Sequence, residues 1–373
     1  MKNRIYKYFF YEFIRYFSVV LFALTAIIWT IQAVNFLDLV VEDGHAFRIY
    51  ILYSFLTVPK ILTKLIPFSF LIASILTILK FEKDNELIIL WTSGLNKIHI
   101  VNLVFKISLL VMLLQFFLSV AITPKTLNFS RALLKNSELQ FVPSLLQERK
   151  FNDTVEGLTI FVDKKTDSGE YKNIFIRDDG NVLTKISTGS STIFAKSGYI
   201  SSNEKSLILL DGNIQKLEDD NSISIITFET TQLNLTGLST KTISETKIQE
   251  TSTIEIISCL AGENIGIRNC GESEEIKEVK IELNKRFGMP FFIPLVSLIS
   301  CFLLTSKKEK INFGINKHIY FIFGFSVLVS SEIAVRYSGI SFKHAAIYYL
   351  IPIIFLPLIY LTLIKKFKYE NLN

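Results

Sequence analysis

The sequence lacks the short motifs that carry most nucleotide, metal and acyl-transfer chemistry in proteins. It has no GxxxxGK[ST] loop, no HExxH or CxxC pair and no GxSxG turn. Its histidines are scattered along the chain, at His45, His99, His318 and His344. We therefore expect a protein that is not an enzyme and that uses no cofactor. Catalysis by carboxylates that converge only in the folded chain stays an alternative.

Charge is also scarce in several long stretches. Half of the 373 residues are apolar, and the mean hydropathy is +0.39. A helix that crosses a membrane needs about 20 apolar residues. Six segments predict such spans, three on each side of a more polar central region: 16–37, 49–79, 107–124, 287–306, 311–331 and 345–364. The first is too long for a signal peptide, so we expect it to be the first span.

Lysine and arginine gather in one set of the short connections between these spans. They precede span one, lie between spans two and three and between four and five, and follow span six. This bias predicts that both termini are cytoplasmic, and it explains the net charge of +6 without a nucleic-acid partner. The predicted domains are spans one to three in 1–124, an external domain in 125–286, and spans four to six in 287–373.

The central region changes character between residues 157 and 236. Short segments rich in Ile, Phe, Val and Thr alternate with polar residues, and 179–181 (DGN) and 211–213 (DGN) are predicted turns. This pattern predicts antiparallel strands in a sandwich or an open barrel, followed by a helical return segment near 250–286. The core of such a domain could be closed by its own side chains or left open as an apolar groove for a lipid tail.

The chain has three cysteines, of which Cys301 lies within span four. Cys259 and Cys270 fall in the external region, where they could form a disulfide in an oxidising compartment. Two unpaired thiols are the alternative.

Lys60 and Lys64 stand out because they lie at membrane depth and one helical turn apart. They form either a cation site for the anionic head of a lipid or a pair that reaches for the interface. Glu332 and Arg336 have the same spacing, and for them an intrahelical ion pair is the preferred interpretation.

The loop KFEKDNELIILWTSGLNK (80–97) predicts a short cytoplasmic helix near 84–94. Asp84 is its predicted N-cap, Glu86 lies in its first turn and Gly94 ends it. So short a helix is not stable alone, so its apolar face must pack on something. That face, which carries Leu87, Leu90 and Trp91, would pack either on the chain's own spans or in a groove of a partner.

Several of these fragments together resemble the lipopolysaccharide-export permeases of the LptF/LptG (YjgP/YjgQ) family. They are YFFYEFIRY before span one, VPKILTKLIPFSFLIA in span two, NELIILWTSGLNKIHI in the loop and RFGMPFFIPL at span four. The fragment VEGLTIFVDKK is more similar to LptF than to LptG. The resemblance covers the whole chain.

The resemblance implies an α-helical membrane protein with six spans (3+3) and an inserted periplasmic all-β, jellyroll-like domain, in the bacterial inner membrane. It implies a heterodimer with a second permease, a cytoplasmic ATPase dimer similar to LptB, and a periplasmic β-jellyroll bridge similar to LptC and LptA. Lipopolysaccharide would be the cargo. Lys60 matches the family's lysine after Val-Pro, whereas Lys64 has no match. Near the end of span one, where relatives carry a lysine, this chain has Asn35 and Asp38.

Two other classes of function stay open at this point. A membrane-anchored periplasmic scaffold or sensor without transport activity would need only one anchor. A lipid-modifying enzyme would need carboxylates or histidines within the membrane, and the spans offer almost none. Six spans with cations at membrane depth favour transport.

Overall fold

The chain folds into a helical unit and a unit that contains a β-sheet. The computed structural model describes residues 2–37, 40, 47–136, 146–153, 157–166, 169–179, 190–201, 206–217, 222–234, 247–262, 273–305 and 313–370. The helical unit comprises Met1–Thr30, Thr57–Asn128 and Lys247–Asn373, and the second unit comprises Ile31–Leu56 and Phe129–Thr246. The segment that returns from the sheet, from Lys247 onward, thus belongs to the helical unit.

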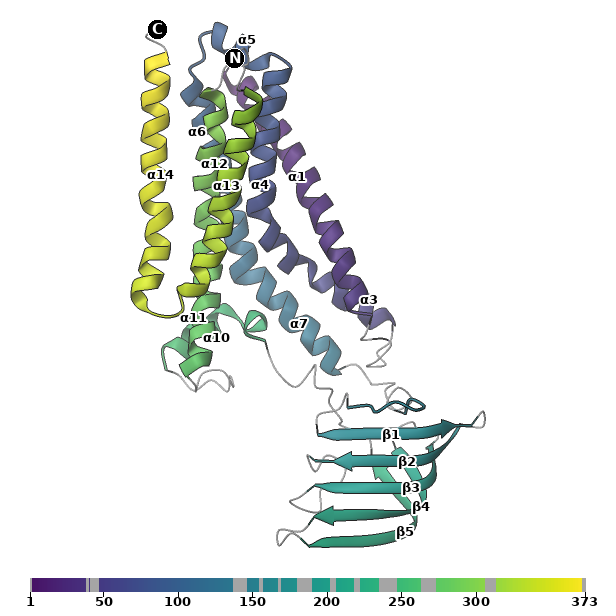
Figure 1. Cartoon of the computed structure of the whole chain (residues 1–373). Helices are drawn as coiled ribbons and strands as arrows, with labels where there is room; N and C mark the ends of the chain where they lie inside the picture. The colour runs from purple at the N-terminus through teal and green to yellow at the C-terminus, as the bar shows by residue number, and fades with distance from the viewer. Residues whose placement is uncertain are drawn as a thin grey trace. The chain divides into compact units, whose positions relative to one another are not determined.

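Six helical stretches are long and apolar enough to cross a membrane, as the sequence predicts. The principal helices are α1 (Lys2–Asn35), α4 (Val58–Lys83), α6 (Lys97–Phe117), α12 (Phe292–Cys301), α13 (Phe313–Tyr337) and α14 (Phe342–Glu370). Shorter helices extend or connect them: α3 (Phe47–Leu56), α5 (Glu86–Thr92), α7 (Thr123–Asn136), α10 (Thr253–Leu260) and α11 (Ser273–Gly288). Figure 1 shows α5, the start of α1 and the end of α14 at one end of the helical unit, and α10 at the other.

The third span lengthens backward past Lys106, as the sequence predicts, but it also continues past residue 124, where the uncharged run 107–124 ends. It begins at Lys97, passes through the π-helical turn η1 (Leu118–Ile122) and continues as α7, so that the apolar stretch ends at Leu134. Lys125 and Arg131 lie within the continuation. The prediction stopped at the first of these charges, but a charge at a helix surface does not end the helix. The π turn ends two residues before Pro124, which cannot donate a regular helical hydrogen bond.

Helix α12 is the centre of the helical unit, because all of its residues are buried. It carries no charge on any face, which is typical of a helix that is enclosed by others. Short 3-10 turns, η4 (Met289–Phe291) and η5 (Phe302–Thr305), flank it. Ser297 of α12 donates a hydrogen bond to Ser108 of α6 over 3.2 Å, so small polar residues let these two helices approach closely.

The outer faces of the helical unit are apolar. Exposed large side chains include Val19 and Phe22 of α1, Leu113 of α6, and Ile322 of α13. Water would solvate so extensive an apolar surface poorly, whereas lipid tails solvate it well. Together with the six long apolar helices, this surface identifies a multi-pass membrane protein.

The β-sheet contains five antiparallel strands in the order β1-β2-β3-β4-β5. They are β1 (Leu158–Lys165), β2 (Glu170–Asp178), β3 (Ser191–Ile200), β4 (Ser206–Leu217) and β5 (Ile223–Asn234). All five coincide with the predicted strands, so the predicted fold class, six spanning helices with an inserted all-β domain, is confirmed. The inner face is buried on β1 to β4, as at Val162, Ile193 and Leu209, whereas β5 buries only Leu233.

One predicted turn is wrong. The DGN stretch at 211–213 lies inside β4, whereas most of the other, at 179–181, lies outside the described residues. Gly212 is there because a Cβ atom would lie 2.2 Å from the carbonyl oxygen of Phe194 and 2.5 Å from the ring of Phe228. Close packing within the sheet, not chain reversal, therefore requires this glycine.

Asp211 belongs to a row of polar residues that crosses the sheet, with one residue on each strand. At this row the alternation of inward and outward side chains shifts by one residue. Regular pairing is interrupted at the same level on all strands, between pairs such as Ala195↔Gly212 and Ser197↔Leu210. The inward residues of β3 change there from Ala195 to Gly198, and those of β2 from Tyr171 to Ile174. The row consists of Asp163, Asn173, Lys196, Asp211 and Glu229. Every strand has one unpaired residue at this level, so the strands stay paired in the same register on both sides of it.

We expect Asp211 to tolerate glycine but not valine. Its φ of 50° lies in the left-handed region, which costs a β-branched residue about 1–2 kcal/mol. Asp211→Val should therefore destabilise the sheet by about that amount, whereas Asp211→Gly should be neutral or stabilising. Pulse proteolysis of the full-length protein in detergent, with cleavage sites in the sheet resolved, measures the difference. Equal stability of the two variants would show that backbone conformation at Asp211 is not the constraint.

Candidate functional site

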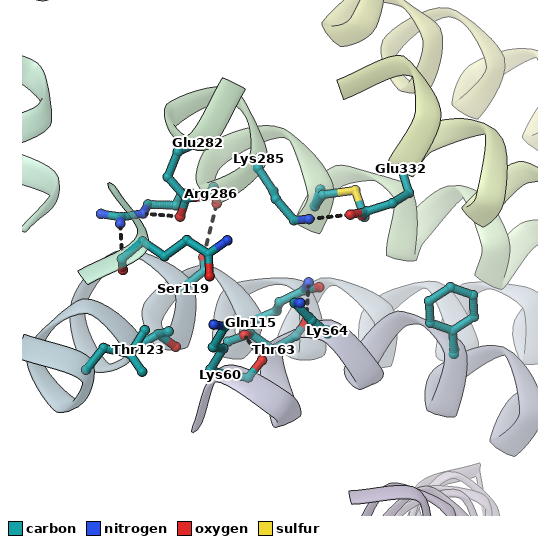
Figure 2. A pocket seen from close by; sticks show the side chains of 14 residues that line it. Lys60, Thr63, Lys64, Gln115, Ser119, Thr123, Glu282, Lys285, Arg286 and Glu332 are labelled. Atoms are coloured by element: carbon teal, nitrogen blue, oxygen red, sulfur yellow. Dashed lines mark hydrogen bonds and ion pairs between the residues drawn. The ribbon is translucent and has the colours of Figure 1, made fainter. Parts of the chain in front are cut away.

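A pocket of about 220 Å³, partly open to the surroundings, lies within the helical unit. Side chains from α4, α6, η1, α7, α11 and α13 converge on it, as Figure 2 shows. Its polar and charged lining residues are Lys60, Thr63, Lys64, Gln115, Ser119, Thr123, Gln249, Glu282, Lys285, Arg286 and Glu332. Both lysines that the sequence singles out are among them, so the structure brings Lys60 and Lys64 into one site.

The charges of this pocket do not balance. Four cations and two carboxylates line it, which leaves a formal excess of two positive charges. Lys285 pairs with Glu332, and Arg286 pairs with Glu282 over 3.0 Å. Among the residues that the structure describes, Lys60 and Lys64 have no ion-pair partner. The pocket is therefore a candidate site for an anionic group, with these two ammonium groups as its unneutralised donors.

Local sequence positions the two lysines. Pro59 lies in the first turn of α4, where a missing N–H breaks no helical hydrogen bond. The helix can therefore begin at Val58, which places Lys60 in its first turn. Lys60 is half-buried and Lys64 is exposed. Four residues of helix separate them, which keeps both on the pocket face.

Pro67 leaves one backbone carbonyl next to these lysines without its helical hydrogen-bond donor. It lies inside α4 and has no N–H, so the carbonyl of Thr63 loses its helical donor. The side chain of Gln115 from α6 donates to that carbonyl over 3.1 Å (Figure 2). Sequence reasoning missed Gln115, although a proline four residues after Thr63 signals that some donor must be near.

Arg286 fixes the return segment to the pocket wall. Its guanidinium is buried and donates to Thr253 over 2.9 Å and to the carbonyl of Gln249 over 3.2 Å. Its own carbonyl accepts from Ser119 over 3.0 Å (Figure 2). Arg286 is thus a structural cation that is fully engaged, and it joins α11 to η1 and to the start of α10.

The preferred interpretation of Glu332 and Arg336 is wrong. The carboxylate of Glu332 pairs with Lys285 of α11, and no ion pair joins it to Arg336 in the described part of the chain. The spacing predicted a contact within α13, but a lysine on a neighbouring helix reaches the same carboxylate. Lys285 and Glu332 are therefore pocket residues that the sequence did not identify.

The predicted cytoplasmic-loop helix exists as α5, Glu86–Thr92, and Glu86 lies in its first turn. Its N-cap is Asn85 in the left-handed conformation, with φ 58°, and not the predicted Asp84. Asp84 ends α4 instead, because α4 runs through Lys83. Gly94 ends α5 as predicted: it has φ +84°, and the N–H of Leu95 bonds to the carbonyl of Leu90 over 3.1 Å.

The apolar face of α5 packs on the protein itself. Leu87 is buried in the core of the helical unit, and Leu90 and Trp91 pack against that core. Of the two alternatives for this face, these contacts fit internal packing. The neighbouring Ile88 and Ile89 are 52% and 64% exposed, so the surface that α5 offers to a partner carries these two residues.

The cysteine prediction is only partly within the described residues. Cys259, on α10, is disulfide-bonded, and Cys301 is free and buried. Cys270 lies outside the described residues, so its pairing with Cys259 stays a prediction. Asp38 also lies outside them, whereas Asn35 is the last residue of α1.

Fold and site together define a class: a polytopic membrane protein with an inserted β-sheet, a pocket with surplus cations and a short exposed helix at the opposite end. A comparison with protein families gives the particular one. Residues 7–366 match the family model described as lipopolysaccharide export system permease LptF/LptG. Because this match spans nearly the whole sequence, the chain belongs to that family.

One curated relative is the Uncharacterized protein RP871 of Rickettsia prowazekii (strain Madrid E). It is 26% identical over 243 residues, which are 65% of this chain and 66% of the relative. The match therefore spans slightly less than two thirds of the relative's length.

We expect Gln115 and Pro67 to be energetically coupled. Gln115→Leu leaves the carbonyl of Thr63 buried without a donor, which should cost about 1–3 kcal/mol. In a Pro67→Ala background the alanine N–H can satisfy that carbonyl, so the same substitution should cost markedly less. Thermal unfolding of the four proteins in detergent gives the cycle. If the two substitutions change the stability additively, Gln115 does not stabilise the protein by donating to the Thr63 carbonyl.

Proposed function

We propose that this chain is a permease subunit of an ATP-driven lipopolysaccharide exporter. In this proposal it extracts the lipid from the outer leaflet of the inner membrane and passes it to a periplasmic β-jellyroll bridge. The observation that carries the proposal is the pair of unneutralised cations, Lys60 and Lys64, in a pocket of a membrane-embedded unit. Membership of the permease family supplies the identity of the lipid, whose head carries negative charge.

Orientation follows from charge and from the position of the ends. The lysine and arginine bias favours cytoplasmic termini. The start of α1, the end of α14 and α5 all lie at one end of the helical unit (Figure 1), so α5 would also face the cytoplasm. Lys60 begins α4 and Lys80 lies near its end, about 30 Å further along a helix, which is close to the thickness of the hydrocarbon core. The pocket would then open toward the outer leaflet.

The proposed partners divide between the two sides of the membrane. On the cytoplasmic side, a dimeric ATPase similar to LptB would bind α5 through the exposed Ile88 and Ile89, beside Glu86. Within the membrane, a second permease of the family would complete a heterodimer. On the periplasmic side, a β-jellyroll protein similar to LptC or LptA would receive the lipid from the sheet.

We further propose that the chain is the LptF paralogue. The fragment VEGLTIFVDKK, which contains all of β1, supports this assignment by its similarity to LptF.

A scaffold or sensor is the alternative function, and two observations disfavour it. An anchor requires neither a completely buried central helix nor a pocket with surplus cations, both of which this helical unit has. Loss of lipopolysaccharide release without loss of assembly in a pocket variant would separate transport from anchoring.

We expect Lys60→Ala to lower lipopolysaccharide release at least about tenfold, because one charge-assisted hydrogen bond contributes roughly 1.5–3 kcal/mol. Lys60→Arg should retain more release than Lys60→Ala, since it keeps the charge. Release from proteoliposomes that contain the complex with its ATPase measures this. Lys343→Ala, which removes an exposed lysine outside the pocket, is the control. Release by Lys60→Ala at the parent rate would refute the assignment of Lys60.

We expect Ile89→Asp to abolish co-purification of the ATPase while the helical unit stays folded, because Ile89 is exposed and contributes no core packing. Leu87→Asp is the contrasting variant: it should reduce the yield of folded protein, since it buries an unpaired carboxylate. Affinity purification and size-exclusion chromatography give both readouts. An ATPase that still co-purifies with Ile89→Asp would mean that it docks elsewhere.

A further inference from the structure

A polar network joins three helices at the α5 end of the helical unit. The ammonium of Lys80 on α4 pairs with Glu12 on α1 over 2.8 Å, and Arg15 lies 4.0 Å from the same carboxyl group. One turn before Glu12, the hydroxyl of Tyr8 donates to the carboxylate of Glu86 on α5 over 3.1 Å. Tyr8 and Glu12 are four residues apart, so a single face of α1 contacts both α4 and α5.

Tyr8 holds both neighbours at once. Its ring lies 5.5 Å from the ring of Phe81 on α4, and the Lys80 ammonium lies 5.9 Å from the Tyr8 ring centre. Its hydroxyl reaches α5. A movement of α5 relative to α4 therefore has to break the hydrogen bond to Glu86 or displace Tyr8, and with it the first turns of α1.

The ion pair between Glu12 and Lys80 is not the simplest way to hold α1 in position. Glu12 is 6% exposed, and a buried ion pair gives little net stability compared with apolar residues of similar size. Its contribution is specificity, because only one relative position of the two helices brings the charges together. The neighbouring ring pairs Phe9–Phe81 and Phe13–Phe70 already supply the apolar contact between these helices.

The first half of α1 packs on the bundle near α5. The buried apolar residues of α1 are Phe9, Phe13, Phe17 and Leu21, all toward the α5 end. Further along, Ile27 is exposed. Thr25 is buried, and near the end of α1 the hydroxyl of Tyr50 on α3 donates to the carbonyl of Ala33 over 3.0 Å, so α1 is held at both ends.

We propose that Tyr8, Glu12, Lys80 and Glu86 form a mechanical link that passes movement of α5 to α1. The link rests on the proposed function, since it requires a partner that moves α5. Tyr8 and Glu12 are positioning residues in it: they contact neither the lipid pocket nor, in this proposal, the ATPase. The link deepens the proposed function by identifying α1 as the helix that responds to the ATPase.

The test uses the purified exporter complex with its ATPase and compares two readouts. The first is lipopolysaccharide released per ATP hydrolysed. The second is the ATP-dependent change in distance between spin labels at Val19→Cys on α1 and Leu113→Cys on α6, both exposed positions. We expect Tyr8→Phe, Glu12→Lys and Lys80→Glu each to lower release per ATP at least about fivefold and to remove the distance change.

Two controls separate a link from a merely structural contact. The exchange Glu12→Lys with Lys80→Glu should restore both readouts, because it restores the ion pair. Tyr11→Phe, at an exposed tyrosine of the same helix, should change neither.

Two results would overturn the link: unchanged release per ATP in all three single variants, or no ATP-dependent distance change in the parent. A parent complex that shows the distance change but releases no lipopolysaccharide would instead refute the proposed cargo and leave the link standing.

Discussion

Two of the four cations that line the pocket of the helical unit are paired with carboxylates, and the other two are not. Glu332 neutralises Lys285, and Glu282 neutralises Arg286, so the surplus charge is concentrated on Lys60 and Lys64. Without these ion pairs four cations would compete for any anion and repel one another. With them, α11 and α13 form a neutral wall, and α4 alone presents charge. In the proposed function, the selectivity of the pocket for an anionic head group depends on this separation of roles.

Helix α4 connects the two functional ends of the protein. It begins beside the pocket with Lys60 and ends beside α5 with Lys80 and Phe81. Pro67 weakens its hydrogen-bond ladder only near the pocket, where Gln115 compensates. The remainder packs on α1 through aromatic residues and on the central helix α12. In the proposed function, this arrangement lets a chain without an ATP-binding motif connect a partner's movement at one end with a lipid site at the other.

Sequence alone predicted what depends on local pattern. Uncharged runs identified six spans, alternation identified five strands, and Gly94 ended α5 through its backbone conformation. Contacts between distant segments could not be predicted from the sequence, because no spacing rule relates their residues. Examples are the contacts of Lys285 with Glu332, of Gln115 with Thr63 and of Tyr8 with Glu86. The DGN stretch at 211–213 shows a second limit, because turn residues also serve bends and close contacts within a strand. The spacing of Leu87, Leu90 and Trp91 correctly predicted that they share one face of a helix. Periodicity does not indicate which neighbour covers that face.

Anion recognition by the two unneutralised lysines is the property on which the proposed function depends most. It is tested most directly by comparing, on the purified complex, binding of lipopolysaccharide with binding of the same lipid after enzymatic removal of its phosphates. We predict that the parent prefers the phosphorylated lipid and that the double variant Lys60→Ala, Lys64→Ala loses this preference while still binding the dephosphorylated form. An undiminished preference in the double variant would contradict the assignment of Lys60 and Lys64 as the site of the anionic head group.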